Sequence, residues 1–143
     1  MAGSFLPMKT VTYTELAKIL ESIIKKPGAD LRNIEFVVGV SRGGLFPAMV
    51  VATKIVKPLI IAYIDKQDNV YFDRAEWIRD KKVLLVDDIV RTGKTMNKIK
   101  KLLLATGAIS VATLTPYFLE KAKRFAPDYG FVTRDDIKFP WDG

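Results

Sequence analysis

The sequence contains neither cysteine nor histidine among its 143 residues. The chain therefore offers no thiol nucleophile, no imidazole base and no zinc site of the Cys/His type. Any bound metal would have to be a hard cation held by oxygen atoms. The absence of cysteine also agrees with a reducing compartment, because such compartments do not favour disulfide bonds.

Long apolar runs are absent as well. No uncharged apolar stretch reaches the roughly 18 residues that indicate a membrane span. Residues 1–9 lack the basic start, apolar centre and small-residue cleavage site of a signal peptide. Hydrophobic residues make up 49% of the chain and charged residues 27%, an ordinary globular mixture. We therefore expect one cytoplasmic domain over residues 1–143, with no membrane partner.

The formal net charge is +7. A basic surface can bind nucleic acid, but it also attracts a multiply anionic small substrate. Six of the basic residues fall in stretches that we expect to be helical: Lys98, Lys100, Lys101, Lys121, Lys123 and Arg124. A solvated helix face explains most of these, so we do not expect nucleic acid as a partner.

The most informative stretch is VLLVDDIVRTGKT at residues 83–95. Its first four residues are apolar β-formers, which predicts a strand that is buried on both faces. Asp87 and Asp88 follow directly, and the loop 92–95 opens a helix. Loop amides at a helix N-terminus favour phosphate, and the carboxylates can accept hydrogen bonds from a ribose diol. The stretch predicts a site for a phosphorylated sugar rather than two acids that only end a strand and cap a helix.

The sequence GKT at residues 93–95 also ends the P-loop motif, G-x-x-x-x-G-K-[ST]. That motif requires a glycine five residues before Gly93, and the residue at this position is Asp88. A P-loop is therefore excluded.

A second strand and loop precede the first. Residues 34–40 (IEFVVGV) predict another buried strand, which runs into Ser41-Arg42-Gly43-Gly44. The glycines permit close approach of the backbone to a ligand, and the apolar run 45–56 predicts a helix.

Strands and helices alternate along the rest of the chain. Thr12 and Glu15 have capping-box spacing and predict the start of an N-terminal helix. Further strands are expected at 59–64, 70–72, 110–114 and 129–132, and a helix at 96–105 that ends at Gly107. This order predicts an α/β fold with a parallel sheet, right-handed crossovers and ligand loops at the carboxyl ends of the strands.

Residues 83–95 resemble the thirteen-residue signature of the type I phosphoribosyltransferases, which bind 5-phosphoribosyl 1-pyrophosphate (PRPP). Residues 38–48 (VGVSRGGLFPA) resemble the pyrophosphate loop of the small xanthine–guanine and hypoxanthine branch of that family. The resemblance implies the family fold: a central, mostly parallel sheet flanked by helices, with a small C-terminal hood over about residues 127–143.

The resemblance also implies a role for each matching residue. Asp87 and Asp88 would be catalytic, hold the ribose hydroxyls and order Mg²⁺ through water. The 5′-phosphate would be bound by Arg91, Thr92, Gly93, Lys94 and Thr95. Pyrophosphate would be bound by Ser41, Arg42, Gly43, Gly44 and Lys66, although a solvent-facing lysine is an equal interpretation of Lys66. The base would be bound by Asp136 and Ile137. Because the Ser-Arg peptide of that branch is commonly cis, we predict a cis peptide between Ser41 and Arg42.

Three positions depart from the 6-oxopurine branch. Arg91 replaces an aspartate that lies near the purine N7, and an arginine cannot take a proton at neutral pH. Asp136 replaces an aromatic residue that stacks on the base; it can accept a purine N–H or be a surface turn residue. Tyr117, with Lys121 as a substitute, falls where a lysine contacts the exocyclic oxygen.

The resemblance implies Mg²⁺-dependent transfer of phosphoribose from PRPP to a nucleobase, which yields a nucleoside 5′-monophosphate and pyrophosphate. A 6-oxopurine is the first acceptor to expect, and the family implies a homodimer or homotetramer. Two alternatives stay open. One is a PRPP-sensing regulator that binds nucleic acid, with an affinity that falls steeply with salt. The other is transfer to a non-purine acceptor.

Overall fold

The structure is a computed structural model that describes residues 6–143. The helices and strands, in chain order, are β1 (Met8–Thr10), α1 (Tyr13–Lys25), β2 (Phe36–Val40), α2 (Leu45–Ile55), β3 (Leu59–Ile64), β4 (Val70–Phe72), β5 (Lys82–Val86), β6 (Ile89–Val90), α3 (Lys94–Thr106), β7 (Ser110–Leu119), β8 (Tyr129–Thr133) and β9 (Asp136–Lys138). Two 3₁₀ helices, Ala75–Trp77 and Glu120–Phe125, follow β4 and β7.

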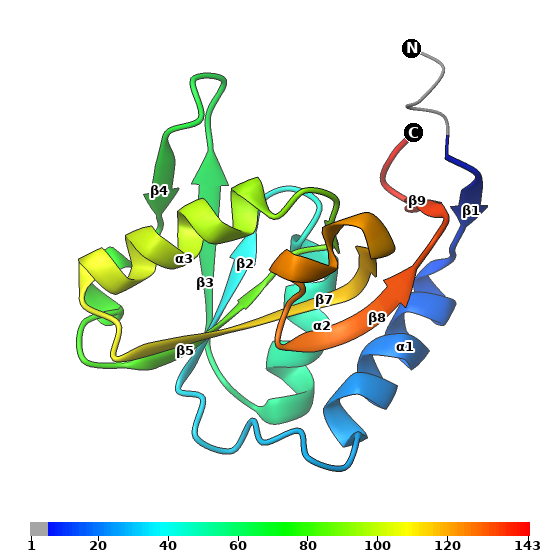
Figure 1. The fold of residues 1–143 in the computed structure, drawn as a ribbon. Helices are drawn as coiled ribbons and strands as arrows, with labels where there is room; N and C mark the ends of the chain where they lie inside the picture. The colour runs from blue at the N-terminus through cyan, green and yellow to red at the C-terminus, as the bar shows by residue number, and fades with distance from the viewer. Residues whose placement is uncertain (1–5) are drawn as a thin grey trace.

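Within these residues, seven strands form a central sheet in the order β4-β3-β2-β5-β7-β6, with β8 also paired to β7 (Figure 1). All of its described pairings are parallel except the β3–β4 hairpin. The α/β fold and the mostly parallel sheet expected from the sequence are therefore confirmed. Strands β5 and β6 pair with one side of β7 in the same register, and Asp87 and Asp88 lie in the interruption between them.

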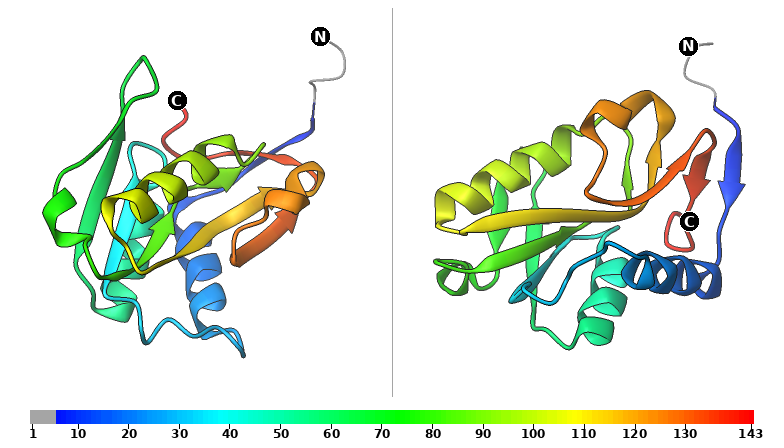
Figure 2. Two further views of the ribbon diagram at one scale, coloured as in Figure 1. Left: turned by 60° about the vertical axis from the view of Figure 1, so that its left-hand side comes forward. Right: turned by 60° about the horizontal axis from the view of Figure 1, so that its bottom comes forward.

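Helices cover both faces of the sheet. Helices α1 and α2 lie on one face and α3 on the other (Figure 2). The buried strand β5 serves both layers, because Leu84 and Val86 pack with α1 and α2 whereas Val83 and Leu85 pack with α3. This two-sided burial confirms the interpretation of residues 83–86. No helix within residues 6–143 is long and apolar enough to cross a membrane.

A second, two-stranded sheet lies beside the central one. It pairs β1 with β9 in parallel, from Met8 opposite Asp136 to Thr10 opposite Lys138. A third core cluster packs beneath it and includes Val11, Ile137 and Phe139. Of the residues expected to form the hood, about 127–143, Tyr129–Thr133 form β8 and extend the central sheet by pairing with β7. Strand β9 pairs with the N-terminal strand β1 in the second sheet.

The ends of several elements differ from the sequence-based expectation. Helix α3 begins at Lys94 rather than Met96, because Gly93 supplies a left-handed N-cap at φ 87°. Strand β7 runs to Leu119 rather than ending at Leu114, with an irregular register between Leu114 and Tyr117 that accommodates Pro116. The capping box at the start of α1 is confirmed.

Three residues other than glycine have positive φ within residues 6–143, namely Val56, Asp68 and Asp80, and of these Val56 is β-branched. Val56, the C-cap of α2, has φ 57° and ψ 55° and is 84% exposed. A β-branched residue is strained in this left-handed region, whereas asparagine adopts it more readily. We expect Val56→Asn to raise the free energy of unfolding by about 0.5–1 kcal/mol. Urea denaturation measures this, with Ile109→Asn as an exposed control at negative φ. An equal effect of the two substitutions would show that backbone strain is not the cause.

Candidate active site

The two adjacent carboxylates lie where the chain leaves the central sheet. Strand β5 ends at Val86, opposite Leu114, and β6 resumes at Ile89, opposite Tyr117. Asp87 still donates its backbone N–H to the Leu114 carbonyl, at 3.2 Å. The interruption therefore holds both acids at the carboxyl edge of the sheet, where open α/β sheets bind ligands.

Local hydrogen bonds orient both carboxylates. Asp87 Oδ1 accepts the backbone N–H of Asp88, and Asp88 Oδ1 accepts that of Ile89, each at 2.8 Å. Loss of hydration raises the pKa of Asp87 well above its usual value, and the neighbouring Asp88 charge adds to this shift. Burial likewise raises the pKa of Asp88. The pair thus concentrates negative charge in a poorly hydrated position, where a ligand that compensates this charge is favoured.

The 92–95 loop forms a cradle beside these acids. Gly93 adopts the left-handed conformation, and a Cβ atom there would lie 2.4 Å from Phe125 Cβ, so only glycine fits. The Thr92 hydroxyl accepts the Lys94 N–H at 3.2 Å, and α3 begins directly behind it. A cavity of about 250 Å³ opens here; it is lined by Asp87, Asp88, Ile89, Val90, Arg91, Thr92, Gly93, Thr95 and Met96. Amides at this helix N-terminus suit a phosphate group.

The 41–44 loop lies against the two acids. The Ser41–Arg42 peptide is cis, which confirms the prediction from the sequence. A Cβ atom on Gly43 would lie 2.2 Å from Asp88 Oδ2, and one on Gly44 would lie 2.7 Å from the Val86 carbonyl oxygen. The glycines are thus required for the close approach of the 41–44 loop to Asp88 and to the end of β5, whereas the sequence indicated only freedom to approach a ligand.

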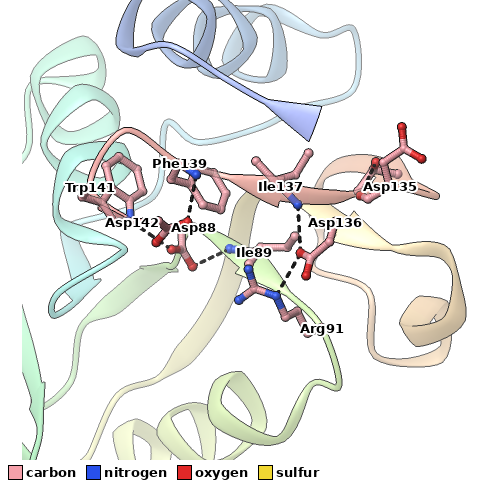
Figure 3. Close-up of polar contacts among 10 residues, drawn as sticks. Asp88, Ile89, Arg91, Asp135, Asp136, Ile137, Phe139, Trp141 and Asp142 are labelled. Atoms are coloured by element: carbon pink, nitrogen blue, oxygen red, sulfur yellow. Dashed lines mark hydrogen bonds and ion pairs between the residues drawn. The ribbon is translucent and has the colours of Figure 1, made fainter. Parts of the chain in front are cut away.

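The C-terminal segment reaches the same place from the second sheet. Trp141 Nε1 donates to Asp88 Oδ2 at 3.4 Å, and its ring stacks on Phe139 at a centroid distance of 4.9 Å (Figure 3). Asp142 Oδ2 accepts the Phe139 N–H at 2.8 Å and so closes the turn. These contacts were not predicted from the sequence. The only local signal was the aromatic and acidic character of the last residues.

Arg91 and Asp136, which are 45 residues apart in the sequence, form an ion pair. Arg91 Nε lies 3.0 Å from Asp136 Oδ1, which also accepts the Ile137 N–H at 2.8 Å (Figure 3). The Ile137 side chain is fully buried in the core beneath β9. Of the two residues predicted to bind the base, only Asp136 therefore presents its side chain, and Ile137 contributes a backbone N–H that orients it.

Seven candidates described above border the site without lining this cavity: Ser41, Arg42, Gly43, Gly44, Lys94, Asp136 and Ile137. Three further candidates lie away from it. Lys66 is exposed in the turn of the β3–β4 hairpin and is not among the residues that line the cavity. Tyr117 is buried with Phe139 in the core beneath the hood, and burial raises the pKa of its hydroxyl. Lys121 lines a different cavity, with Glu120 and Arg134. The structure thus places neither Tyr117 nor Lys121 beside the two carboxylates.

Together, a loop at a helix N-terminus, a pair of carboxylates and a glycine loop meet at one sheet edge, an arrangement that suits a ligand with phosphate and hydroxyl groups. Residues 11–143 match the family described as phosphoribosyl transferase domain. The chain therefore belongs to the phosphoribosyl transferase domain family, and the resemblance seen in its two loops is confirmed.

Individual relatives agree with this assignment. The chain is 28% identical over 125 residues to the xanthine-guanine phosphoribosyltransferase of Chromohalobacter salexigens, covering 78% of this chain and 70% of that protein. The crystal structure of purine phosphoribosyltransferase from Pyrococcus horikoshii Ot3 is similar with a TM-score of 0.80 at 25% identity, over 96% of both chains. Hypoxanthine phosphoribosyltransferase from Trypanosoma cruzi, in complex with the product IMP, shares the fold at a TM-score of 0.68 and 18% identity, over 85% of this chain and 74% of that one. The chain is thus similar in sequence or in fold to enzymes that are named for purine bases.

Proposed function

We propose that this protein transfers the phosphoribosyl group of PRPP to a 6-oxopurine base in the cytoplasm, yielding a nucleoside 5′-monophosphate and pyrophosphate. The observation that carries the proposal is the position of Asp87 and Asp88 between the 92–95 loop and the 41–44 loop. A sugar bound over the two carboxylates would have its 5′-phosphate at the first loop and its pyrophosphate at the second. The named relatives are purine enzymes, so a PRPP-sensing regulator is not favoured.

The residues of the site can each assist this reaction. The amides of the 92–95 loop and the Thr92 and Thr95 hydroxyls would hold the 5′-phosphate, with Lys94 adding positive charge. The 41–44 loop would bind pyrophosphate, which leaves as its bond to C1′ breaks and the bond from the purine nitrogen forms. The proton on that nitrogen would pass to the leaving pyrophosphate or to water. Asp87 and Asp88 would accept the ribose hydroxyls and stabilise the positive charge that develops on the sugar.

The two carboxylates also fit Mg²⁺. Within residues 6–143, neither carboxylate takes part in a salt bridge. Nor do the described residues contain a group of three or more acidic side chains that could enclose a metal. Mg²⁺ is commonly held by one or two carboxylates together with substrate phosphates. Asp87 and Asp88 would hold the ion, through water, and the ion would neutralise pyrophosphate charge when bound.

Release of pyrophosphate from PRPP and Mg²⁺, with one base per reaction, tests the proposal. We expect turnover with hypoxanthine, guanine or xanthine and none without a base. The panel also includes adenine and the pyrimidine bases, and calorimetry measures PRPP binding in parallel. Binding of PRPP without turnover on any base would contradict the acceptor class. Absence of both binding and turnover would contradict the proposed function as a whole.

A further inference from the structure

The Arg91 side chain is held in one direction by the second sheet. Its Nε nitrogen donates a hydrogen bond to the Asp136 carboxylate. The same carboxylate accepts a hydrogen bond from the Ile137 N–H, which orients it. In Figure 3 the guanidinium lies between Asp136 on one side and Ile89 and Asp88 on the other, and its two terminal nitrogens lie on the side of Asp88. Among the contacts within residues 6–143, the Arg91 side chain forms its hydrogen bond through Nε, so these two donors are available to a ligand on the side of the two carboxylates.

The place of Arg91 in the site favours contact with a ligand over a position on open surface. It lines the cavity that contains the two acids. The side chain is 46% exposed and that of Asp136 is 23% exposed, so a ligand could cover the pair.

The ion pair also argues against a role for the Arg91 side chain at the 5′-phosphate. Asp136 compensates the guanidinium charge, which weakens its attraction for a phosphate dianion. The phosphate cradle has its own donors in the backbone amides at the start of α3, with Thr92 and Thr95 beside them. The sequence-based assignment of Arg91 to the phosphate thus fits its backbone position in the loop but not the direction of its side chain.

We infer that Arg91, positioned by Asp136, binds the acceptor base and recognises the O6 and N7 edge of a 6-oxopurine. This inference rests on the proposed function. A guanidinium is a planar fork of donors, and O6 and N7 are two adjacent acceptors in the same plane, so the two match bidentately. Adenine carries an amino group in place of O6, which would set donor against donor and leave both unpaired.

Asp136 is a positioning residue in this arrangement. It occupies Nε and leaves the two terminal nitrogens to form the fork. Asparagine at this position retains an acceptor for the Ile137 N–H but loses the charge that attracts Arg91. The effects of removing Arg91 and of changing Asp136 should therefore be non-additive, because both act through one contact to the base.

Calorimetry on the full chain tests the inference without requiring turnover. The probes are inosine 5′-monophosphate, its 7-deaza analogue (in which a C–H group replaces N7), adenosine 5′-monophosphate, and PRPP. The variants are Arg91→Met, Arg91→Lys, Asp136→Asn and the double variant Arg91→Met/Asp136→Asn. Arg32→Met is the matched control, because Arg32 also pairs with an aspartate but lies on the surface with 89% of its side chain exposed.

We expect Arg91→Met to raise the Kd of inosine monophosphate by about 5- to 150-fold, the range for one good bidentate pair. Wild type should prefer inosine monophosphate to both other nucleotides, and this preference should disappear in Arg91→Met. Lysine should restore it only in part, because it lacks the fork. The Kd of inosine monophosphate should be no higher in the double variant than in Arg91→Met. The Kd of PRPP should change less than twofold throughout.

Three results would overturn the inference while the proposed function stands. One is turnover in wild type together with an unchanged Kd of inosine monophosphate in Arg91→Met. Another is an equal loss of PRPP and nucleotide affinity, which would return Arg91 to the phosphate. The third is a full preference for N7-containing nucleotide in Arg91→Met. Failure of the proposed function is distinct, since wild type would then neither bind PRPP nor release pyrophosphate.

Discussion

Replacing Asp88 by asparagine is expected to weaken PRPP binding by about 10- to 150-fold, as for the loss of one charge-assisted hydrogen bond worth roughly 1.5–3 kcal/mol. The substitution preserves size, and the new amide oxygen can still accept the Ile89 N–H that Asp88 Oδ1 now accepts at 2.8 Å. What it removes is the negative charge that the ribose hydroxyls and Mg²⁺ would meet. Calorimetry with PRPP and Mg²⁺ measures the change. Unchanged affinity would show that the ribose lies elsewhere.

The same substitution at Asp87 should lower activity and yet raise stability. The pKa of Asp87 is raised in the folded protein by burial and by the Asp88 charge, from an ordinary value of 3.8. The unfolded chain loses its proton near that value, whereas the folded chain retains it to higher pH. Above pH 3.8, folding of the wild type therefore becomes less favourable as pH rises through the raised pKa. Asparagine does not titrate, so the stability of the Asp87→Asn variant does not fall with pH for this reason.

Thermal unfolding from pH 4 to pH 8 measures this effect. The Tm of Asp87→Asn minus that of wild type should grow with pH through this range until the folded-state carboxyl is ionised. Asp30→Asn is a control of opposite sign, because a hydrogen bond from Arg32 lowers the pKa of Asp30. That surface substitution should reduce Tm slightly at neutral pH. A Tm of Asp87→Asn below wild type at neutral pH would contradict the burial argument.

Features of the fold that depend on neighbouring residues in the chain were predicted from the sequence. The apolar run at residues 83–86 required a strand with both faces covered, and Leu84 and Leu85 indeed pack into opposite layers. Capping-box spacing predicted the start of α1. The 41–44 loop was predicted from glycines that follow a buried strand, and the 92–95 loop from the two acids and the Thr-Gly-Lys-Thr sequence that follow another. These predictions succeeded because the residues that determine each feature are close together in the chain.

The contacts that complete the site could not be predicted in this way. Arg91 and Asp136 are 45 residues apart, and Asp88 and Trp141 are 53 apart. Nothing in the spacing of either pair indicates the contact, which follows from the parallel pairing of β1 with β9 beside the central sheet. The departures at Arg91 and Asp136 looked independent in the sequence, and only their proximity shows that they form one unit.

Gly44→Ala is expected to be the most damaging small substitution in the site. Gly44 has φ −81° and ψ −3°, which alanine adopts without strain, so the effect arises from contacts alone. The new Cβ would lie 2.7 Å from the Val86 carbonyl oxygen, 2.8 Å from that of Val40 and 2.9 Å from Asp87 Cα. All three atoms belong to the backbone, so relief of the close contacts would require a shift of the central strands. We expect a loss of about 2–3 kcal/mol in the free energy of unfolding, at the upper end for overpacking.

Gly43→Ala should separate function from stability, because its Cβ would meet a side chain instead. The nearest atom is Asp88 Oδ2, at 2.2 Å, and this carboxylate can rotate away. Rotation would break the contacts to Ile89 and Trp141 and misdirect the acceptor for the ribose, so turnover and PRPP affinity should fall about as far as in Asp88→Asn. The free energy of unfolding, measured in urea, should change by less than about 1 kcal/mol.

Since the two glycines are adjacent, each variant is the control for the other. Equal losses of stability would rule out backbone crowding at Gly44 as the cause, and wild-type turnover in Gly43→Ala would mean that the orientation of Asp88 does not matter for catalysis.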